Sequence, residues 1–332
     1  MSHQQATAAG AAFVHQACFY GSNDEFLAMA VPFVEDGLAR NEPVLAAVTA
    51  ANIDVLNEAL GSCADDVEYA DTAYFGRRPP QRVASFDRYW KRRSTPAAEH
   101  VRILAEPVWF GRSRQEVVEW KRLESGLNSI LAATNIWMIC PYDTRVVDPA
   151  IIADARRTHP AHVQGHAAHT CPEFVEPQEF AARCDADPLP PPPARAAALP
   201  FTGDLRSVRE FATTQADVLG LTGGAISLWT VAVGEIAGYV ASHGSGRAAV
   251  RVWAHRGNLV CEVHDPGGRL PDRFLGYRPP AVEPEPGDEL WFPFQVCEHV
   301  DIRSGAAGYT VRLHFPGPRS EQTLLAAIGS PG

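Results

Sequence analysis

A proline-rich run near the middle of the chain constrains its fold more than any other feature. Five of the eight residues from Asp187 to Ala194 are proline. Because proline fixes φ and lacks an amide N–H, such a run cannot continue a helix or lie inside a sheet, and it favours an extended spacer. The 332 residues are enough for a domain of ordinary size on either side. We predict a first domain over 1–183, a linker over 184–199, a second domain over 200–317 and a tail over 318–332.

Composition excludes several classes of protein. With 46% hydrophobic and 20% charged residues the chain has the composition of a folded protein, and its net charge of −10 argues against binding nucleic acid. The seven cysteines are spread singly, as is usual for reduced thiols. The first residues do not resemble a signal peptide, and no apolar stretch reaches the roughly 20 residues of a membrane span. We therefore expect a soluble, cytoplasmic protein that binds neither nucleic acid nor membrane.

The first half alternates strand and helix patterns. Short apolar runs predict strands at 13–20, 43–49, 67–70, 101–105 and 136–140. Apolar residues at helical spacing predict helices over 25–40, through Leu56 and Leu60, and over about 114–131. Strands that alternate with helices predict a mostly parallel sheet covered on both faces, which is a three-layer α/β domain.

The second half is ordered differently. The pattern predicts helices over 205–219 and 225–242, a hairpin of 250–254 with 259–263, a helix over 290–299, and strands at 300–302 and 309–314. Helices followed by an antiparallel sheet predict a two-layer α/β domain.

Polar residues lie near the predicted strand ends of the first domain. His15 and Tyr20 lie on the first strand, Glu106 follows the fourth strand and Asp143 follows the fifth, with Trp109 nearby. Because ligands of parallel α/β sheets bind at the carboxyl ends of the strands, we predict that these five side chains hold a small polar or aromatic molecule. The alternative is a core histidine with turn-capping carboxylates and no ligand.

A histidine-rich segment invites a metal-binding interpretation. Its members are His159, His162, His166, His169 and Cys171, at spacings that could place several imidazoles on one helical face. Pro160 and Gly165 interrupt any such helix. We therefore predict no metal site.

Five segments of the first domain form a recognisable set: 15–20 (HQACFY), 33–38 (FVEDGL), 124–128 (ESGLN), 140–143 (CPYD) and 157–160 (RTHP). On these segments the first domain resembles the MEDS sensory domain, over about 12–180. The resemblance implies a sheet like that of the RecA-type ATPases, without the phosphate loop. The turn at 21–25 lacks the lysine and the spacing of such a loop, so ATP is not the expected ligand here.

Three segments of the second domain occur in a characteristic order: 235–244 (EIAGYVASHG), 263–268 (VHDPGG) and 287–291 (GDELW). On these segments, over about 201–316, the second domain resembles the ATP-binding domain of anti-sigma-factor serine kinases and sensor histidine kinases, the GHKL superfamily. The resemblance implies ATP and Mg²⁺ as cofactors, with Glu235 as general base or metal-positioning residue. It also implies nucleotide contacts at Asp265, Gly267, His243 and Gly287.

Three positions depart from that family. Tyr239 replaces the asparagine that holds Mg²⁺, Arg269 replaces a glycine of the adenine loop, and Asp288-Glu289 interrupts the phosphate loop. A phenol does not replace an amide oxygen on a hard cation, and the two carboxylates would repel a polyphosphate. We therefore predict an inactive or weak domain.

The favoured function is that of a regulator in which a small ligand on the first domain controls how the second domain docks a protein partner. By resemblance, the partner is an anti-anti-sigma protein or a sigma factor. Two alternatives remain: an active ATP-dependent serine-protein kinase acting on an anti-anti-sigma factor, and a scaffold without ligands. The sensed ligand and a homodimeric state stay open.

Overall fold

The computed structural model describes residues 12–280, 283 and 285–318. The chain divides into two units, Met1–Cys184 and Asp185–Gly332, and the division falls at the beginning of the predicted linker. Each unit has its own sheet, and the two-domain α/β class expected from the sequence is confirmed.

The first unit has a seven-stranded sheet in the order β3-β2-β4-β5-β1-β6-β7. The strands are β1 (Val14–Tyr20), β2 (Val44–Val48), β3 (Glu68–Asp71), β4 (Val101–Ala105), β5 (Ile136–Asp143), β6 (Ala161–Gln164) and β7 (Ala167–Thr170). Strands β1 to β6 pair in parallel, and β7 pairs with β6 in the antiparallel sense. Every residue of β2 and β4 is buried, as expected for parallel strands covered on both faces.

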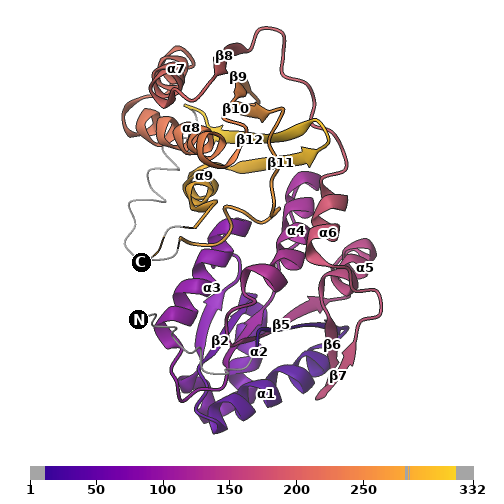
Figure 1. Cartoon of the computed structure of the whole chain (residues 1–332). Coiled ribbons are helices and arrows are strands. Elements are labelled where there is room, and N and C mark those ends of the chain that lie inside the picture. Colours follow the sequence, from indigo (N-terminus) through magenta and orange to yellow (C-terminus); the bar gives the residue numbers. More distant parts are fainter. Residues whose placement is uncertain (1–11, 281–282, 284, 319–332) are drawn as a thin grey trace, which may run out of the picture. The chain divides into compact units, whose positions relative to one another are not determined.

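Helices cover both faces of this sheet (Figure 1). Helices α1 (Asn23–Ala39) and α2 (Ala50–Leu60) lie on one side, with the 3-10 helix η1 (Gly61–Asp66) following α2. Helices α3 (Pro79–Arg93), α4 (Arg114–Ile130) and α5 (Pro149–Thr158) lie on the other, and α6 (Pro177–Cys184) packs against α4. A capping box between Ser113 and Glu116 begins α4 by satisfying two backbone N–H groups. The first unit is therefore a three-layer α/β domain.

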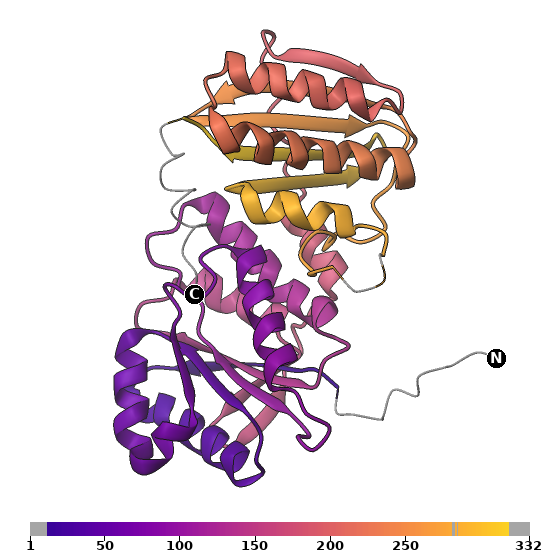
Figure 2. The ribbon, with the colours of Figure 1, turned by 90° about the vertical axis from the view of Figure 1, so that its left-hand side faces the viewer.

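The second unit has five antiparallel strands with helices on one face, as Figure 2 shows. The strands are β8 (Ala197–Phe201), β9 (Ala248–His255), β10 (Asn258–Asp265), β11 (His299–Gly305) and β12 (Gly308–Pro316), in the order β11-β12-β10-β9-β8. The helices are α7 (Leu205–Val218), α8 (Gly223–His243), the 3-10 helix η2 (Asp288–Leu290) and α9 (Trp291–Val296).

Two predictions for the second unit are wrong. Residues 197–199, assigned to the linker, belong to β8, so a strand precedes the helices. Pro200 hid this strand, because proline is tolerated only at sheet edges, where β8 lies. The helix predicted over 290–299 ends at Val296, and His299 already begins β11.

Helix α8 differs from the expectation that no apolar stretch is long enough to span a membrane. Within the described part of the chain it is the one helix that is long and apolar enough to cross a membrane. Half of its most apolar 18-residue stretch is buried inside the protein. Trp229 is fully buried and donates from Nε1 to the carbonyl of Ala212 on α7, 3.0 Å away. Helix α8 therefore packs against α7 within the second unit.

Candidate functional site

The alternation of side chains along β1 divides the predicted ligand site in two. His15 and Tyr20 are five positions apart, so they point to opposite faces of the sheet. Tyr20 faces α1 and α2 and contacts Glu106, whereas His15 faces α4 and contacts Asn128. The prediction that His15 and Glu106 meet in one site is therefore wrong.

On the α1–α2 side, Glu106 is the centre of a closed network. Its carboxylate accepts hydrogen bonds from Tyr20 Oη at 3.0 Å, Asn52 Nδ2 at 2.9 Å and the backbone N–H of Thr49 at 2.8 Å. The Asn52 amide also donates to Tyr20 Oη at 2.9 Å. Both oxygens of the buried carboxylate are thus engaged by the protein itself.

Asp143 lies next to Tyr20 in the sheet but has a separate partner. Its carboxylate forms an ion pair with Arg145 at 2.7 Å, and this hydrogen-bonded guanidinium lowers the pKa of Asp143. Asp143 is partly exposed and Arg145 is exposed, so Asp143 ends β5 with its carboxylate paired at the surface.

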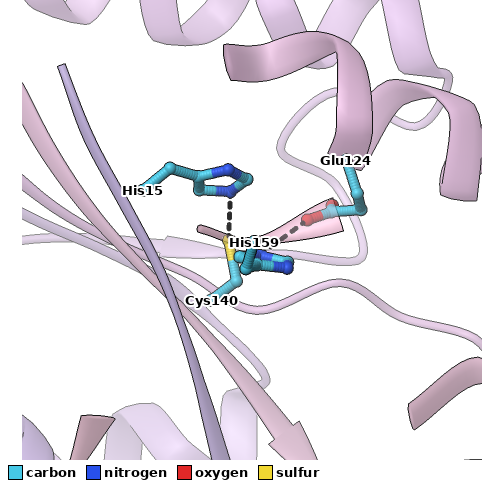
Figure 3. A group of neighbouring side chains, drawn as sticks. All are labelled: His15, Glu124, Cys140 and His159. Carbon is cyan, nitrogen blue, oxygen red and sulfur yellow. Dashed lines mark hydrogen bonds and ion pairs between the residues drawn. The ribbon is translucent and has the colours of Figure 1, made fainter. Parts of the chain in front are cut away.

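On the α4–α5 side, four buried side chains converge (Figure 3). They are His15 on β1, Glu124 on α4, Cys140 on β5 and His159, which directly follows α5. One ligand atom from each lies within 4.8 Å of those of the other three. His15 Nε2 is 3.4 Å from Cys140 Sγ, and His159 Nε2 is 3.5 Å from Glu124 Oε2. We call this group the His–Cys–Glu cluster.

The outer nitrogen of each imidazole is anchored. Asn128 donates from Nδ2 to the carbonyls of Ser125 and Thr158, so its Oδ1 is the atom that faces His15 Nδ1 at 3.1 Å. His159 Nδ1 lies 2.8 Å from the carbonyl of Ala155. Since both partners are acceptors, both Nδ1 atoms carry the proton and donate it. The two Nε2 atoms therefore present lone pairs toward the centre of the cluster.

Burial controls the charges of the cluster. It raises the pKa of Glu124 to about 7, against the opposing effect of Arg82, and it raises the pKa of the Cys140 thiol. It lowers the pKa of His159 to about 4, and the pKa of His15 is lowered by burial and by His159. Without a bound cation, this environment favours the neutral form of each group.

Trp109 belongs to this side of the sheet. Its ring stacks on Tyr142 with centroids 6.3 Å apart, and Tyr142 meets His159 edge-on at 5.7 Å. Tyr142 also donates from Oη to Glu124 Oε2 at 3.3 Å. Among the described residues, the buried Nε1 of Trp109 has no hydrogen-bond partner. Trp109 and His15 are thus the two predicted ligand residues that lie near the cluster.

The histidine-rich segment is not a helix. Helix α5 ends at Thr158, and His162 and His169 lie opposite each other on β6 and β7. Cys171 Sγ is 3.6 Å from His162 Nδ1, and His166 lies in the turn between the strands. Only His159 of this segment enters the His–Cys–Glu cluster.

Glu124 and Cys140 were missed, and His15 was not expected to meet His159, because these residues are distant in sequence. A usable signal was present, since His15, Glu124, Cys140 and His159 all lie in segments that carry the MEDS resemblance. Nothing in their spacing along the chain indicated that these segments meet.

In the second unit, Asp265 ends β10 and is fully buried. It accepts hydrogen bonds from the backbone N–H groups of Ser245, Gly267 and Gly268 at 2.7, 3.0 and 2.8 Å, and from Ser245 Oγ at 2.5 Å. Burial acts to raise the pKa of Asp265, but these donors lower it on balance. A Cβ on Gly268 would lie 2.4 Å from the carboxylate, so the loop closes tightly around Asp265.

The residues predicted to bind the nucleotide phosphates and Mg²⁺ in the second unit contact one another and their neighbours. Tyr239 is buried, with its ring 5.2 Å from that of His243 and 6.2 Å from that of Tyr309. His243 Nε2 lies 3.4 Å from Glu289 Oε1. Gly287, in the left-handed region at φ 101°, donates its N–H to Glu289 at 3.1 Å.

Glu235 lies on the same helix as Tyr239 and His243. Burial raises the pKa of Glu235, and the charge of Glu289 raises it further. Glu235, His243 and Gly287 therefore gather around one carboxylate, that of Glu289, while Asp265 and Gly267 lie in a separate closed loop.

Part of the first unit matches a known protein family. Residues 14–160 match the family model described as MEDS, the MEthanogen/methylotroph, DcmR Sensory domain. No curated protein matches the chain. A solved structure of the RsbU and RsbW domains of a Mycobacterium tuberculosis protein is 19% identical over 36% of this chain and 32% of that chain, with a TM-score of 0.27. The match thus spans about a third of that chain, and this score does not establish a shared fold.

Proposed function

With a MEDS sensory domain over residues 14–160, we propose that the chain is an intracellular signal-transduction regulator. The first unit senses a small ligand, and the second unit docks a protein partner without catalysing phosphotransfer. The family match carries the sensory half of this proposal. The hydrogen bonds of the Asp265 carboxylate support a second unit that does not catalyse phosphotransfer.

Adenine recognition in GHKL proteins, which the second domain resembles in sequence, needs a carboxylate with a free acceptor position. The Asp265 carboxylate already accepts four hydrogen bonds from its own chain. Three of these hydrogen bonds go to Oδ1 and one to Oδ2, and the side chain is fully buried, so the carboxylate is not presented to the amino group of adenine. This supports a domain that has kept the architecture and lost the nucleotide.

The phosphate side supports the same conclusion. Glu289 places a negative charge beside Glu235, and like charges disfavour a bound polyphosphate. Tyr239 packs its ring between His243 and Tyr309. A tyrosine in this position offers no compact oxygen ligand to Mg²⁺.

The proposed partner is an anti-anti-sigma protein or a sigma factor, by resemblance of the second domain. Regulation requires two states of the chain that differ in affinity for the sensed ligand and for the partner. The free energy that couples the two sites would be carried through the polypeptide that joins the units.

An active kinase is the second candidate, and one observation favours it. The raised pKa of Glu235 suits a general base, which works best when its pKa lies near the working pH. Isothermal titration of ATP into the full chain, with and without Mg²⁺, separates the two. We expect no Mg²⁺-dependent heat. Micromolar, Mg²⁺-dependent binding would exclude the non-catalytic proposal and favour the kinase.

A matched variant pair sharpens this experiment. Glu289→Gln removes the charge beside Glu235, and Tyr239→Asn restores the family's metal-binding amide. If nucleotide binding was lost through these positions, the double variant gains ATP affinity while Glu298→Gln, an exposed carboxylate of the same unit, does not.

A further inference from the structure

We infer that the His–Cys–Glu cluster is a binding site for a divalent transition-metal cation of the Zn²⁺ class. His15, Glu124, Cys140 and His159 supply two imidazole nitrogens, one thiolate and one carboxylate oxygen. All four residues belong to the first unit, so the test of this site does not depend on the function of the second unit.

The spacing of the ligand atoms fits a four-coordinate metal. A tetrahedral zinc site with bonds of about 2.0 to 2.3 Å has its ligand atoms about 3.3 to 3.8 Å apart. The two pairs with measured separations, His15–Cys140 at 3.4 Å and Glu124–His159 at 3.5 Å, already lie in this range. All four atoms lie within 4.8 Å of one another, so small side-chain movements complete the site.

The residues around the cluster orient its imidazoles. Metal-binding histidines usually donate their second N–H to a carbonyl or a carboxylate, which fixes the ring and its tautomer. His15 donates to Asn128 Oδ1, and His159 donates to the carbonyl of Ala155. The Nε2 of His159 is fully buried and makes no hydrogen bond within the described structure. A metal ion would give this buried lone pair a partner.

Charge balance also favours a divalent cation. One thiolate, one carboxylate and two neutral imidazoles carry two negative charges, so the complex with a divalent ion has no net charge. A buried site tolerates this arrangement far better than it tolerates an isolated ion.

The donor set selects the class of metal. Cys140 and the two imidazoles are borderline or soft donors that suit Zn²⁺, Co²⁺ or Fe²⁺, whereas Mg²⁺ and Ca²⁺ prefer oxygen ligands. The second unit has a comparable group in His299, Asp301 and His314, but it contains no thiol. There, the Asp301 carboxylate lies 2.9 Å from His299 Nε2 and 3.1 Å from His314 Nε2, so both imidazoles already face a charged partner. The cluster of the first unit is therefore the stronger candidate among the described residues.

Cobalt is the probe that tests the site, because a thiolate–Co²⁺ bond has its own charge-transfer absorption. The full chain is stripped of metal, shown to be folded by circular dichroism, and titrated with Co²⁺. We expect saturation at one equivalent, with the charge-transfer band and the visible spectrum of a tetrahedral ion. Absence of the band in the folded wild-type protein overturns the inference.

Three cysteine variants locate the bond. Cys140→Ser should lose the charge-transfer band. Cys18→Ser should keep it, since Cys18 is a buried cysteine of β1 on the opposite face of the sheet. Cys171→Ser should also keep it, although Cys171 lies beside His162. A band that survives Cys140→Ser, or that disappears in Cys171→Ser, contradicts the assignment.

A further variant keeps the test decisive if Cys140→Ser does not fold. Glu124→Gln retains the thiolate and the shape of the side chain but removes one anionic ligand. It should keep the charge-transfer band and weaken Co²⁺ binding by more than about tenfold, which is the smallest loss typical even of changes around a metal site. Unchanged affinity would exclude Glu124 from the site and with it the proposed ligand set.

Discussion

His15 Nε2 lies 3.4 Å from Cys140 Sγ, although the two residues are 125 positions apart in the sequence. Strand β1 runs parallel to β5 with Ala17 opposite Cys140, and His15 points to the same face as Ala17. The two side chains therefore meet on the face that α4 covers, where Glu124 and His159 complete the cluster.

A bound metal should stabilise the first unit. Any ligand that binds only the folded state raises the free energy of unfolding, by about 2.7 kcal/mol at a free concentration roughly 100 times Kd. We expect urea unfolding of the metal-free chain to shift to higher concentration when Zn²⁺ is added. Cys140→Ser should show no shift, and an equal shift in that variant would assign the effect to another site.

Removing Asn128, the hydrogen-bond acceptor that orients His15, should weaken metal binding without removing a metal ligand. In Asn128→Ala, the Nδ1–H of His15 loses its acceptor and the ring loses its fixed orientation. We expect Co²⁺ affinity to fall about 10- to 100-fold while the charge-transfer band keeps its shape. Asn57→Ala, on the exposed face of α2, is the matched control and should bind Co²⁺ like the wild type.

The network around Glu106 should act on stability. Glu106→Gln replaces one acceptor oxygen by an amino group that faces the donors Tyr20, Asn52 and Thr49. We expect the free energy of unfolding to fall by about 1 to 3 kcal/mol, the usual cost of leaving such buried groups unpaired. Glu58→Gln, an exposed substitution on α2, should be near neutral. An unchanged stability in Glu106→Gln would indicate that this network is open to solvent or to a ligand.

The Asp265 loop should give the second unit an acid-sensitive contribution. Because the pKa of Asp265 is lower in the folded state than its ordinary value of about 4, the ionised group stabilises the fold above that value. This contribution is lost as the pH falls through the folded-state pKa. We therefore expect Asp265→Asn to be less stable than the wild type at neutral pH, with the difference shrinking below about pH 4. Unfolding curves of both proteins across this range test it, and a difference that does not change with pH would contradict it.

The pattern of the sequence was sufficient for most elements. The strands β1, β2, β4 and β5 appear within a few residues of their predicted bounds, because buried parallel strands are short apolar runs. The helices α3 and α5 were not predicted. Helix α3 is rich in charged side chains and begins with Pro79 and Pro80, but its apolar residues Val83, Phe86 and Trp90 have helical spacing, so this helix was readable from the sequence.

The candidate site was predicted less well. The period of two residues along β1 already separates His15 from Tyr20, so the division of the predicted ligand site was readable from the sequence. The hydrogen bonding of Asp265 was not readable, because it depends on a contact with Ser245, which is 20 positions away in the loop between α8 and β9.

The sequence by itself determined the two-domain plan, the alternating elements of the first unit and the departures Tyr239 and Asp288-Glu289 in the second. These features are local, since they depend on proline geometry, on hydrophobic period and on residue type. Only the tertiary structure decided that His15, Glu124, Cys140 and His159 share one buried site. The physical reason is that strand order sets which distant residues become neighbours, and strand order is selected by packing of the whole sheet rather than by any one segment.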